Sequence, residues 1–306
     1  MIDTKMIDEK ELQSMLYLLD DSDERIVEQI EIKILSLGLD VVPILERQWP
    51  IEESTTRQER MIELIKIINQ NTLVNSLEKW QDTEEQDLMD GLLIINKIAN
   101  PNVDRKAIDN MLDKIKLDAW LEMNYDLTSF EKVKILNHII FDVHGFKGDT
   151  ENYHHSRNSF LGSVLERKIG NPVSLAIIYS LVAQRLNIPI YGVNLPQHFI
   201  LGYVRDFDFG PLLRFNDEPD LPGTAGSDIL FYINPFNNGL IFNHDNIHKF
   251  LTQLKLEPKQ DYFKVCTNKD ILLRVLTNLE VSFSKEKKQH KLEQVVQLLR
   301  VLKTVT

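Results

Sequence analysis

Glycine and proline are unevenly distributed along the 306 residues, and this distribution restricts the fold more than any other feature. The chain has 12 glycines and 11 prolines, and 18 of these 23 residues lie between positions 141 and 260. Residues 261–306 contain neither type. Both types favour turns and disfavour helix interiors. The sequence therefore predicts helical ends and a central segment of strands and tight turns.

Both ends show apolar residues at helical spacing. Near the N-terminus these stripes cover 12–19 and 26–37, separated by an acidic turn, and the pattern weakly resembles one HEAT repeat. At the other end, Thr267 and Asp270 have the spacing of a helix-capping pair, and two apolar stripes follow. These stripes predict an αα-hairpin, which must dock on the middle domain or on a partner because two short helices cannot bury both faces alone.

The central segment begins with a helix signal. Asn171 suits the capping position, and Pro172 suits the first helical position because its missing N–H would have no partner there. Strands are expected at 190–193 and 198–204, the second placing His198 on one face with alternate residues. Asn238-Gly239 between two further apolar runs predicts a two-residue hairpin turn. A helix followed by antiparallel strands indicates an α+β domain.

An ordered set of motifs resembles the SirB1-type branch of the transglutaminase-like superfamily. These motifs are Asn158-Ser159-Phe160-Leu161, Val164-Leu165-Glu166-Arg167, Gly170-Asn171-Pro172-Val173-Ser174-Leu175, Leu195-Pro196-Gln197-His198-Phe199 and Ile233-Asn234-Pro235-Phe236-Asn237. Residues 273–279 are similar to the tetratricopeptide-like tail of that branch. The resemblance covers roughly residues 135–306. It implies a transglutaminase-like (papain-like) α+β domain over 135–262 and a tetratricopeptide-like hairpin over 263–306. Residues 1–134 lie outside the resemblance, and their apolar spacing predicts a helical N-terminal region.

The resemblance also implies where a catalytic site would lie. In the superfamily a Cys begins a helix, a His lies on the next strand, and an Asp or Asn on the following strand orients the imidazole. The matching positions here hold Pro172, His198 and Asn234, so the nucleophile is missing. Ser174 is the alternative nucleophile. It lies about 200° around the helix from Pro172, and a serine in a first turn more often bonds to nearby backbone.

The remaining candidate ligands and nucleophiles are sparse. Cys266 is the single cysteine and is expected to be a small buried apolar residue rather than a nucleophile. One cysteine excludes an internal disulfide or a cysteine-based metal cluster. His144, His154 and His155 lie close together in sequence, where a surface loop is favoured over a metal site. The sequence therefore predicts neither a metal nor a cofactor.

Charge and hydropathy restrict the partners. The net charge is −11, from 35 Lys and Arg against 46 Asp and Glu, which disfavours binding to nucleic-acid backbones or anionic membranes. No apolar run approaches the roughly 20 residues of a membrane-spanning helix, and the first residues lack the apolar core of a signal peptide. The sequence therefore predicts a cytoplasmic protein that binds neither nucleic acid nor membrane.

Two functions follow from these patterns. The favoured one is a non-catalytic pseudoenzyme, a scaffold or regulatory module whose helical ends bind a protein partner. The alternative is a hydrolase or acyltransferase acting on an amide or ester, with Ser174 as nucleophile and His198 and Asn234 in support. The polar segment 205–228 is either a flap over this cleft or a surface insertion. The partner and the oligomeric state stay open.

Overall fold

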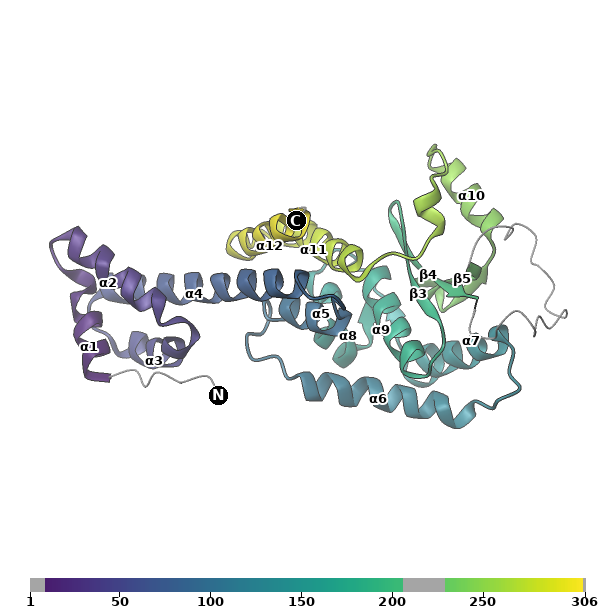
Figure 1. Ribbon diagram of the computed structural model, residues 1–306, viewed down its shortest axis with the longest axis horizontal. Coiled ribbons are helices and arrows are strands. Elements are labelled where there is room, and N and C mark those ends of the chain that lie inside the picture. The colour runs from purple at the N-terminus through teal and green to yellow at the C-terminus, as the bar shows by residue number, and fades with distance from the viewer. Residues whose placement is uncertain (1–8, 206–228, 305–306) are drawn as a thin grey trace. The chain divides into compact units, whose positions relative to one another are not determined.

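The computed structural model describes residues 9–205 and 229–304 (Figure 1). Nearly all of the polar segment 205–228 therefore lies outside the described residues. The chain divides into two compact units, Met1–Lys79 and Trp80–Thr306. Helices combined with small sheets confirm the α+β class. The three-part division with boundaries after residues 134 and 262 stays a prediction.

The first unit is built from helices. They are α1 (Glu9–Tyr17), α2 (Glu24–Ser36), α3 (Val42–Gln48) and the beginning of α4 (Thr55–Gln81). Residues of both apolar stripes, together with residues of α3 and α4, form this unit's core, where Leu19, Ile34 and Leu45 are completely buried. Asp23 caps α2 by accepting a hydrogen bond from the Arg25 N–H at 3.0 Å. The expected helical character of this end is confirmed.

The second unit combines helices with short strands. Its helices are α5 (Leu88–Asn96), α6 (Arg105–Glu122), α7 (Ser129–Asn137), α8 (Leu161–Arg167), α9 (Pro172–Arg185), α10 (His244–Gln253), α11 (Asn268–Lys285) and α12 (Gln289–Lys303). Its strands are β1 (Lys147–Gly148), β2 (Ile169–Gly170), β3 (Ile190–Leu195), β4 (His198–Val204), β5 (Ile229–Asn234) and β6 (Leu240–Phe242). Strands β1 and β2 pair in parallel, and β3-β4-β5-β6 form an antiparallel sheet in that order.

The connection between β5 and β6 is longer than the expected two-residue turn. A 3₁₀ turn over Pro235–Asn237 comes before Asn238 and Gly239, and Asn234 pairs with Leu240. Pro235 has no N–H to donate to the strand ladder, so β5 ends before it. Asn238 and Gly239 do adopt the positive φ values, 48° and 72°, that the Asn-Gly pattern favours.

One face of the four-stranded sheet packs against α10. Val193, Leu195, Ile200 and Tyr232 form a buried cluster with Ile247 and with Leu251, the last two from α10. His198 is paired with Leu195 across the β3–β4 turn, so both side chains lie on this face. Because side chains alternate along a strand, the neighbouring residues of β4 point to the other face.

The opposite face packs against α7 and α9. Tyr203 pairs with Phe231 on this face, and Phe130 of α7 meets the Phe231 ring edge-on at a centroid distance of 6.4 Å. Tyr179 of α9 donates a hydrogen bond to the Asn137 side chain of α7 at 2.9 Å, which joins the two helices. Figure 1 shows α9 and α10 on opposite sides of the strands. The sheet therefore separates two helical layers.

The C-terminal helices form the expected αα-hairpin. Thr267 and Asp270 make a complete capping box at the start of α11: Asp270 N–H donates to Thr267, and the Asp270 carboxylate accepts from the Thr267 N–H. Helix α11 packs against α5, α9 and β3. Of the two expected docking partners, the hairpin therefore uses the middle of its own chain.

We expect Gly239→Ala to lower the free energy of unfolding more than Gly145→Ala. Both glycines have positive φ, 72° and 71°, so both substitutions carry a backbone cost of about 1 kcal/mol. A Cβ at Gly239 would also collide with the Asn137 amide, whereas a Cβ at Gly145 meets open space. The added cost at Gly239 should be about 1–3 kcal/mol. Urea denaturation of both variants checks this, and equal losses would contradict the packing of the β5–β6 connection on α7.

Candidate functional site

A small, partly open cavity lies between the sheet and α10. Its volume is about 150 Å³. The lining side chains are Leu195, His198, Ile200, Asn234, Phe242, Asn246, Ile247 and Phe250. His198 and Asn234, two of the residues singled out from the sequence, therefore share one cavity. Ser174 and Pro172 do not line it.

His198 is held by packing rather than by hydrogen bonds. Its ring lies edge-on to Phe250 of α10, with a centroid distance of 4.9 Å. No hydrogen bond joins the imidazole to any residue within 9–205 or 229–304. Burial, and secondly the positive charge of Arg274, lower the pKa of His198. The imidazole is therefore neutral at pH 7, with one donor and one acceptor nitrogen.

In Asn234 and Asn246, the side-chain amide oxygen makes a hydrogen bond and the amide nitrogen makes none within the described residues. Asn234 Oδ1 accepts a hydrogen bond from the Phe236 N–H at 3.1 Å. Asn246 Oδ1 accepts from the Asn243 N–H at 3.1 Å, within the capping box of α10. Neither Nδ2 group donates to another described residue. Asn234 therefore bonds to the backbone two residues further on and not to His198. In a catalytic arrangement it would orient the His198 imidazole.

Ser174 is engaged in capping α9. Its Oγ accepts from the Asn171 N–H at 3.0 Å and lies 3.1 Å from the Asn171 carbonyl, to which it donates. Its N–H donates in return to Asn171 Oδ1 at 3.0 Å. The side chain is 2% exposed, and Pro172 beside it is also buried. The serine hydroxyl is therefore occupied by backbone of its own helix start, as its first-turn position indicates.

The expected site residues thus fall into two groups. Pro172 and Ser174 begin α9, which covers one face of the sheet. His198 lies on the other face, against α10. Asn234 ends β5 and shares the cavity with His198. This arrangement gives His198 no hydrogen bond to Ser174, and a general base must reach its nucleophile at about 3 Å or through one water.

The structure also shows the surroundings of Cys266 and of His144. Burial raises the pKa of Cys266 to about 12, so the thiol is protonated at neutral pH, and its N–H donates to the Gly192 carbonyl at 2.8 Å. His144 is largely buried and lies 2.8 Å from Asp118, so it is not the surface histidine that the sequence indicated. In the described part of the chain, no group of three or more His, Cys, Asp or Glu side chains could hold a metal ion.

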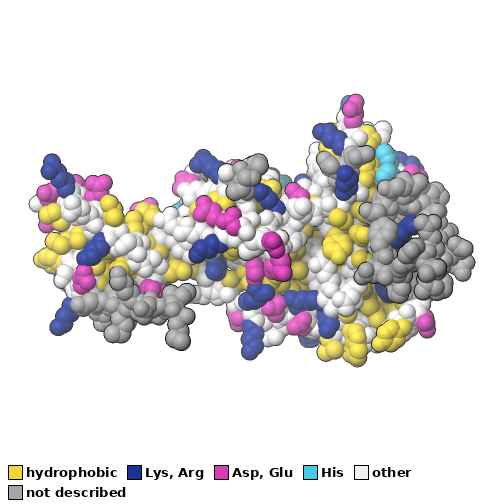
Figure 2. Space-filling model, in the orientation of Figure 1, with side chains coloured by type: hydrophobic (Ala, Val, Ile, Leu, Met, Phe, Trp, Pro, Cys, Tyr) yellow, Lys and Arg dark blue, Asp and Glu magenta, His cyan; other side chains and the backbone are white. Residues whose placement is uncertain are grey.

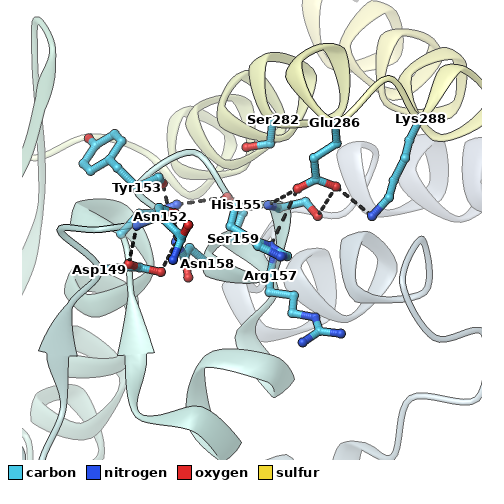
Figure 3. A network of polar contacts seen from close by, with 12 residues as sticks. Asp149, Asn152, Tyr153, His155, Arg157, Asn158, Ser159, Ser282, Glu286 and Lys288 are labelled. Atoms are coloured by element: carbon cyan, nitrogen blue, oxygen red, sulfur yellow. Dashed lines mark hydrogen bonds and ion pairs between the residues drawn. The ribbon is translucent and has the colours of Figure 1, made fainter.

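A network of hydrogen bonds holds together the loop over residues 149–159, which precedes α8 (Figure 3). Asn158 is completely buried, and its Nδ2 donates to Asp149 at 3.0 Å and to the Asn152 carbonyl at 2.9 Å. Its Oδ1 accepts from Arg167 at 3.2 Å. Burial favours a higher pKa for Asp149, but hydrogen bonds from Asn152 and Asn158 outweigh it and lower the pKa. Asn158, the first residue of the family-like motifs, therefore has a structural role: its side chain joins Asp149, Asn152 and Arg167.

Glu286 ties this loop to the C-terminal hairpin. The carboxylate, at the end of α11, accepts from the Ser156 N–H at 2.7 Å and from the Ser156 hydroxyl at 3.0 Å, and it pairs with Lys288 at 2.7 Å. Figure 3 shows Glu286 pointing from α11 toward the loop. Burial favours a higher pKa, but the Lys288 and Ser156 hydrogen bonds outweigh it and lower the pKa of Glu286. A charged carboxylate therefore fastens the hairpin at neutral pH.

The comparisons with known proteins agree with this architecture. A family model described as the transglutaminase-like superfamily matches residues 106–277. The chain belongs to this superfamily. The match begins earlier than the stretch from 135 on which the sequence resemblance rested, so it includes α6 and α7. No solved structure shows a significant match.

Curated relatives come from bacteria and from animals. A UPF0162 protein of Xylella fastidiosa (strain 9a5c) is 35% identical over 131 residues, covering 42% of this chain and 46% of that protein. A UPF0162 protein of Vibrio cholerae is 26% identical over 164 residues, covering 54% and 53%. F-box only protein 21 of Homo sapiens is 24% identical over 159 residues, covering 44% and 25%. The chain spans about half the length of these bacterial relatives and about a quarter of the human one.

Part of the cavity was not identified from the sequence. Asn246, Ile247 and Phe250 come from α10, whose signal is an asparagine cap at Asn243 followed by apolar residues at helical spacing. The sequence therefore contains a signal for the helix itself. The spacing of its apolar residues does not show that this helix covers the face of the sheet that carries His198. Similarly, 130 residues separate Ser156 from Glu286, and no local pattern relates them.

We expect Asn158→Ala to destabilise the protein by about 2–4 kcal/mol, because it removes a completely buried amide that donates to Asp149 and to the Asn152 carbonyl and accepts from Arg167. Asn152→Ala is the matched control: that side chain is exposed, and only its backbone takes part in the network. Urea denaturation of both variants measures the difference. A loss below about 0.5 kcal/mol at Asn158 would contradict its structural role.

The lowered pKa of His198 makes stability depend on pH. The unfolded chain takes up the proton more readily, so this contribution is complete above about pH 6.5 and declines as the pH falls toward the folded-state pKa. We expect the free energy of unfolding to fall between pH 7.5 and 5.5, and to fall less in His198→Gln. His244, whose pKa burial and His248 also lower, leaves a remaining slope. An imidazole NMR titration midpoint for His198 at or above about 6.5 would contradict the burial of this ring.

Proposed function

We propose that this chain is a non-catalytic transglutaminase-like protein that binds another protein as a scaffold or regulatory module. The observation that carries the proposal is the residue at the start of α9. By the sequence resemblance, Pro172 stands where the superfamily has its cysteine; it is the first residue of α9, and a proline side chain offers no nucleophile. The hydroxyl of Ser174, two residues further on, makes hydrogen bonds with the Asn171 backbone in the capping box.

The separation of the groups across the sheet supports the same proposal. A hydrolase needs a base beside its nucleophile, and His198 faces α10 while Ser174 lies at the start of α9. The neutral His198 imidazole has no carboxylate or amide partner among the described residues to fix its tautomer. The residues that match the family motif therefore favour a retained fold over a retained reaction.

Helix α6 supports protein binding because it is apolar on two faces. Ile108, Leu112, Ile115 and Ala119 are buried. On the outward face Leu117 is 51%, Trp120 59% and Leu121 67% exposed. Hydrophobic side chains gather at the lower edge of Figure 2, where Figure 1 places the end of α6. Contiguous exposed apolar groups that include a tryptophan are typical of protein interfaces.

The occupant of this α6 face is proposed to be a different protein rather than a second copy. Each copy carries a net charge of −11, and like charges oppose self-association. Further parts of the proposal rest on the sequence resemblance. They are membership of the SirB1-type branch and a tetratricopeptide-like identity for the α11–α12 hairpin. Residence in the cytoplasm is proposed from the hydropathy of the sequence and its single cysteine. Within the described residues, no helix has the length and apolarity needed to cross a membrane.

The chemical half of the proposal is tested with acyl-directed electrophilic probes. We expect no labelling that depends on His198, because no activated nucleophile lies beside it. Wild type, His198→Ala and Ser174→Ala are compared by mass spectrometry of intact protein and of peptides. Labelling of Ser174 in the wild type that disappears in His198→Ala would contradict the proposal and establish a serine-type acyl transfer.

The binding half is tested by photo-crosslinking in cells. We expect a crosslinking amino acid at position 117 to capture another protein, with capture falling at least about tenfold when Trp120→Glu is added, since a buried charge disrupts an apolar interface. The same amino acid at position 122, on the side of α6 away from this stripe, is the control. Trp120→Glu should leave the unfolding free energy within about 0.5 kcal/mol. Equal capture from both positions, or an adduct with a second copy, would contradict the proposal.

A further inference from the structure

We propose that the cavity between β4, β5 and α10 binds a small carboxylate that carries one apolar ring or branched chain. The inference is independent of protein binding: a chain that captures no partner at α6 would still bind the acid, and a chain that binds a partner need not.

The size and walls of the cavity select a single apolar group. A space of about 150 Å³ lined by apolar side chains accommodates a benzene-sized molecule. Five of the lining side chains are apolar, namely Leu195, Ile200, Phe242, Ile247 and Phe250. Drug-sized ligands need roughly 300 Å³ or more. The cavity therefore fits one ring or one branched chain and no larger skeleton.

The polar lining offers more free donors than free acceptors. Asn234 and Asn246 each use their amide oxygen to accept a backbone N–H, which fixes the orientation of the amide and leaves Nδ2 without a partner among the described residues. His198, when neutral, adds one N–H donor and one acceptor nitrogen, so donors outnumber free acceptors. Because the amide oxygens are already engaged, a ligand in this cavity is recognised through its own acceptor oxygens.

The charge around the cavity favours an anionic acceptor. No aspartate or glutamate is among the residues that line it. Arg274 of α11 acts on His198 through its positive charge, and its guanidinium donates to Asn194 Oδ1 at 3.4 Å. Across residues 9–205 and 229–304, Arg274 forms no ion pair. A carboxylate in the cavity therefore meets N–H donors and no lining carboxylate, whereas an ammonium group finds one neutral acceptor, the unprotonated nitrogen of His198, and no anion.

Three probes of the same shape test the charge and the donors. Benzoate, benzamide and benzylammonium are titrated into the full chain at pH 7, and binding is followed by NMR shifts of the His198 imidazole and the Asn side-chain amides. We expect benzoate to bind tightest, benzamide at least about tenfold more weakly, and benzylammonium not at all, because hydrogen bonds to a charged acceptor are the stronger ones. Tighter binding of benzylammonium, or no shift with any probe up to about 10 mM, would overturn the proposal.

A matched pair of variants places the ligand in the cavity. Asn246→Asp keeps the oxygen that accepts from the Asn243 N–H but replaces the free donor by a negative charge, and we expect benzoate affinity to fall at least about tenfold. Asn243→Asp adds the same charge at the cap of the same helix, keeps the capping oxygen and does not line the cavity. We expect it to change the affinity about twofold at most, because the added charge does not line the cavity and dissolved ions screen charges at a distance. Equal losses in both variants would show that only net charge matters and would contradict the site.

Discussion

The structure of the second unit depends on the packing of two helical layers against one antiparallel sheet. Side chains alternate along β4, so Ile200 packs on α10 while Tyr203 lies on the face covered by α7 and α9. A shift of one residue in the β3–β4 register would exchange every contact on both faces. The same alternation decides that His198 lines the α10 cavity and does not face the start of α9. The alternation of side chains along β4 therefore determines both the packing of the two helical layers and the position of His198.

The polar groups at the start of α9 stabilise the beginning of the helix. Asn171 caps the helix, its Nδ2 donates to Ser159, and Ser174 completes the box. The loop before it is closed by Asn158 and is fastened to the C-terminal hairpin by Glu286. A free nucleophile needs an unengaged group at this helix end, and this chain instead uses the local polar groups to stabilise the helix. The retained motifs are explained by these contacts.

Much of the fold could be predicted from local signals. The Asn171-Pro172 start of α9 and the Thr267–Asp270 capping box are determined by residues within one helical turn, and both predictions are confirmed. The prediction of a two-residue turn at Asn238-Gly239 was wrong because a 3₁₀ turn over Pro235–Asn237 lies between β5 and Asn238 and lengthens the connection. Local signals extend over a few residues, so they locate the beginnings and ends of elements well.

The candidate site was less predictable because its geometry depends on distant residues. His198 and Asn234 were identified, and they do share a cavity, but the layer that covers them begins at Asn243. Glu286 reaches a loop 130 residues earlier in the chain. Strand alternation indicates which residues accompany His198 on its face, but only the packing of α10 shows that this face is covered and apolar. Whether two family-like residues belong to one site is decided by such tertiary contacts.

Because strand alternation places His198 on the α10 face, we expect that the start of α9 and His198 do not form one chemical site. This expectation is tested most directly by restoring a cysteine with Pro172→Cys in a Cys266→Ala background and measuring the thiol pKa by ¹³C NMR, with and without His198→Gln. A helix N-terminus lowers a thiol pKa by itself, so the difference between the two proteins isolates the imidazole. The account predicts equal thiol pKa values. A thiol pKa lower by one unit or more only when His198 is present would contradict it and would indicate a latent catalytic pair.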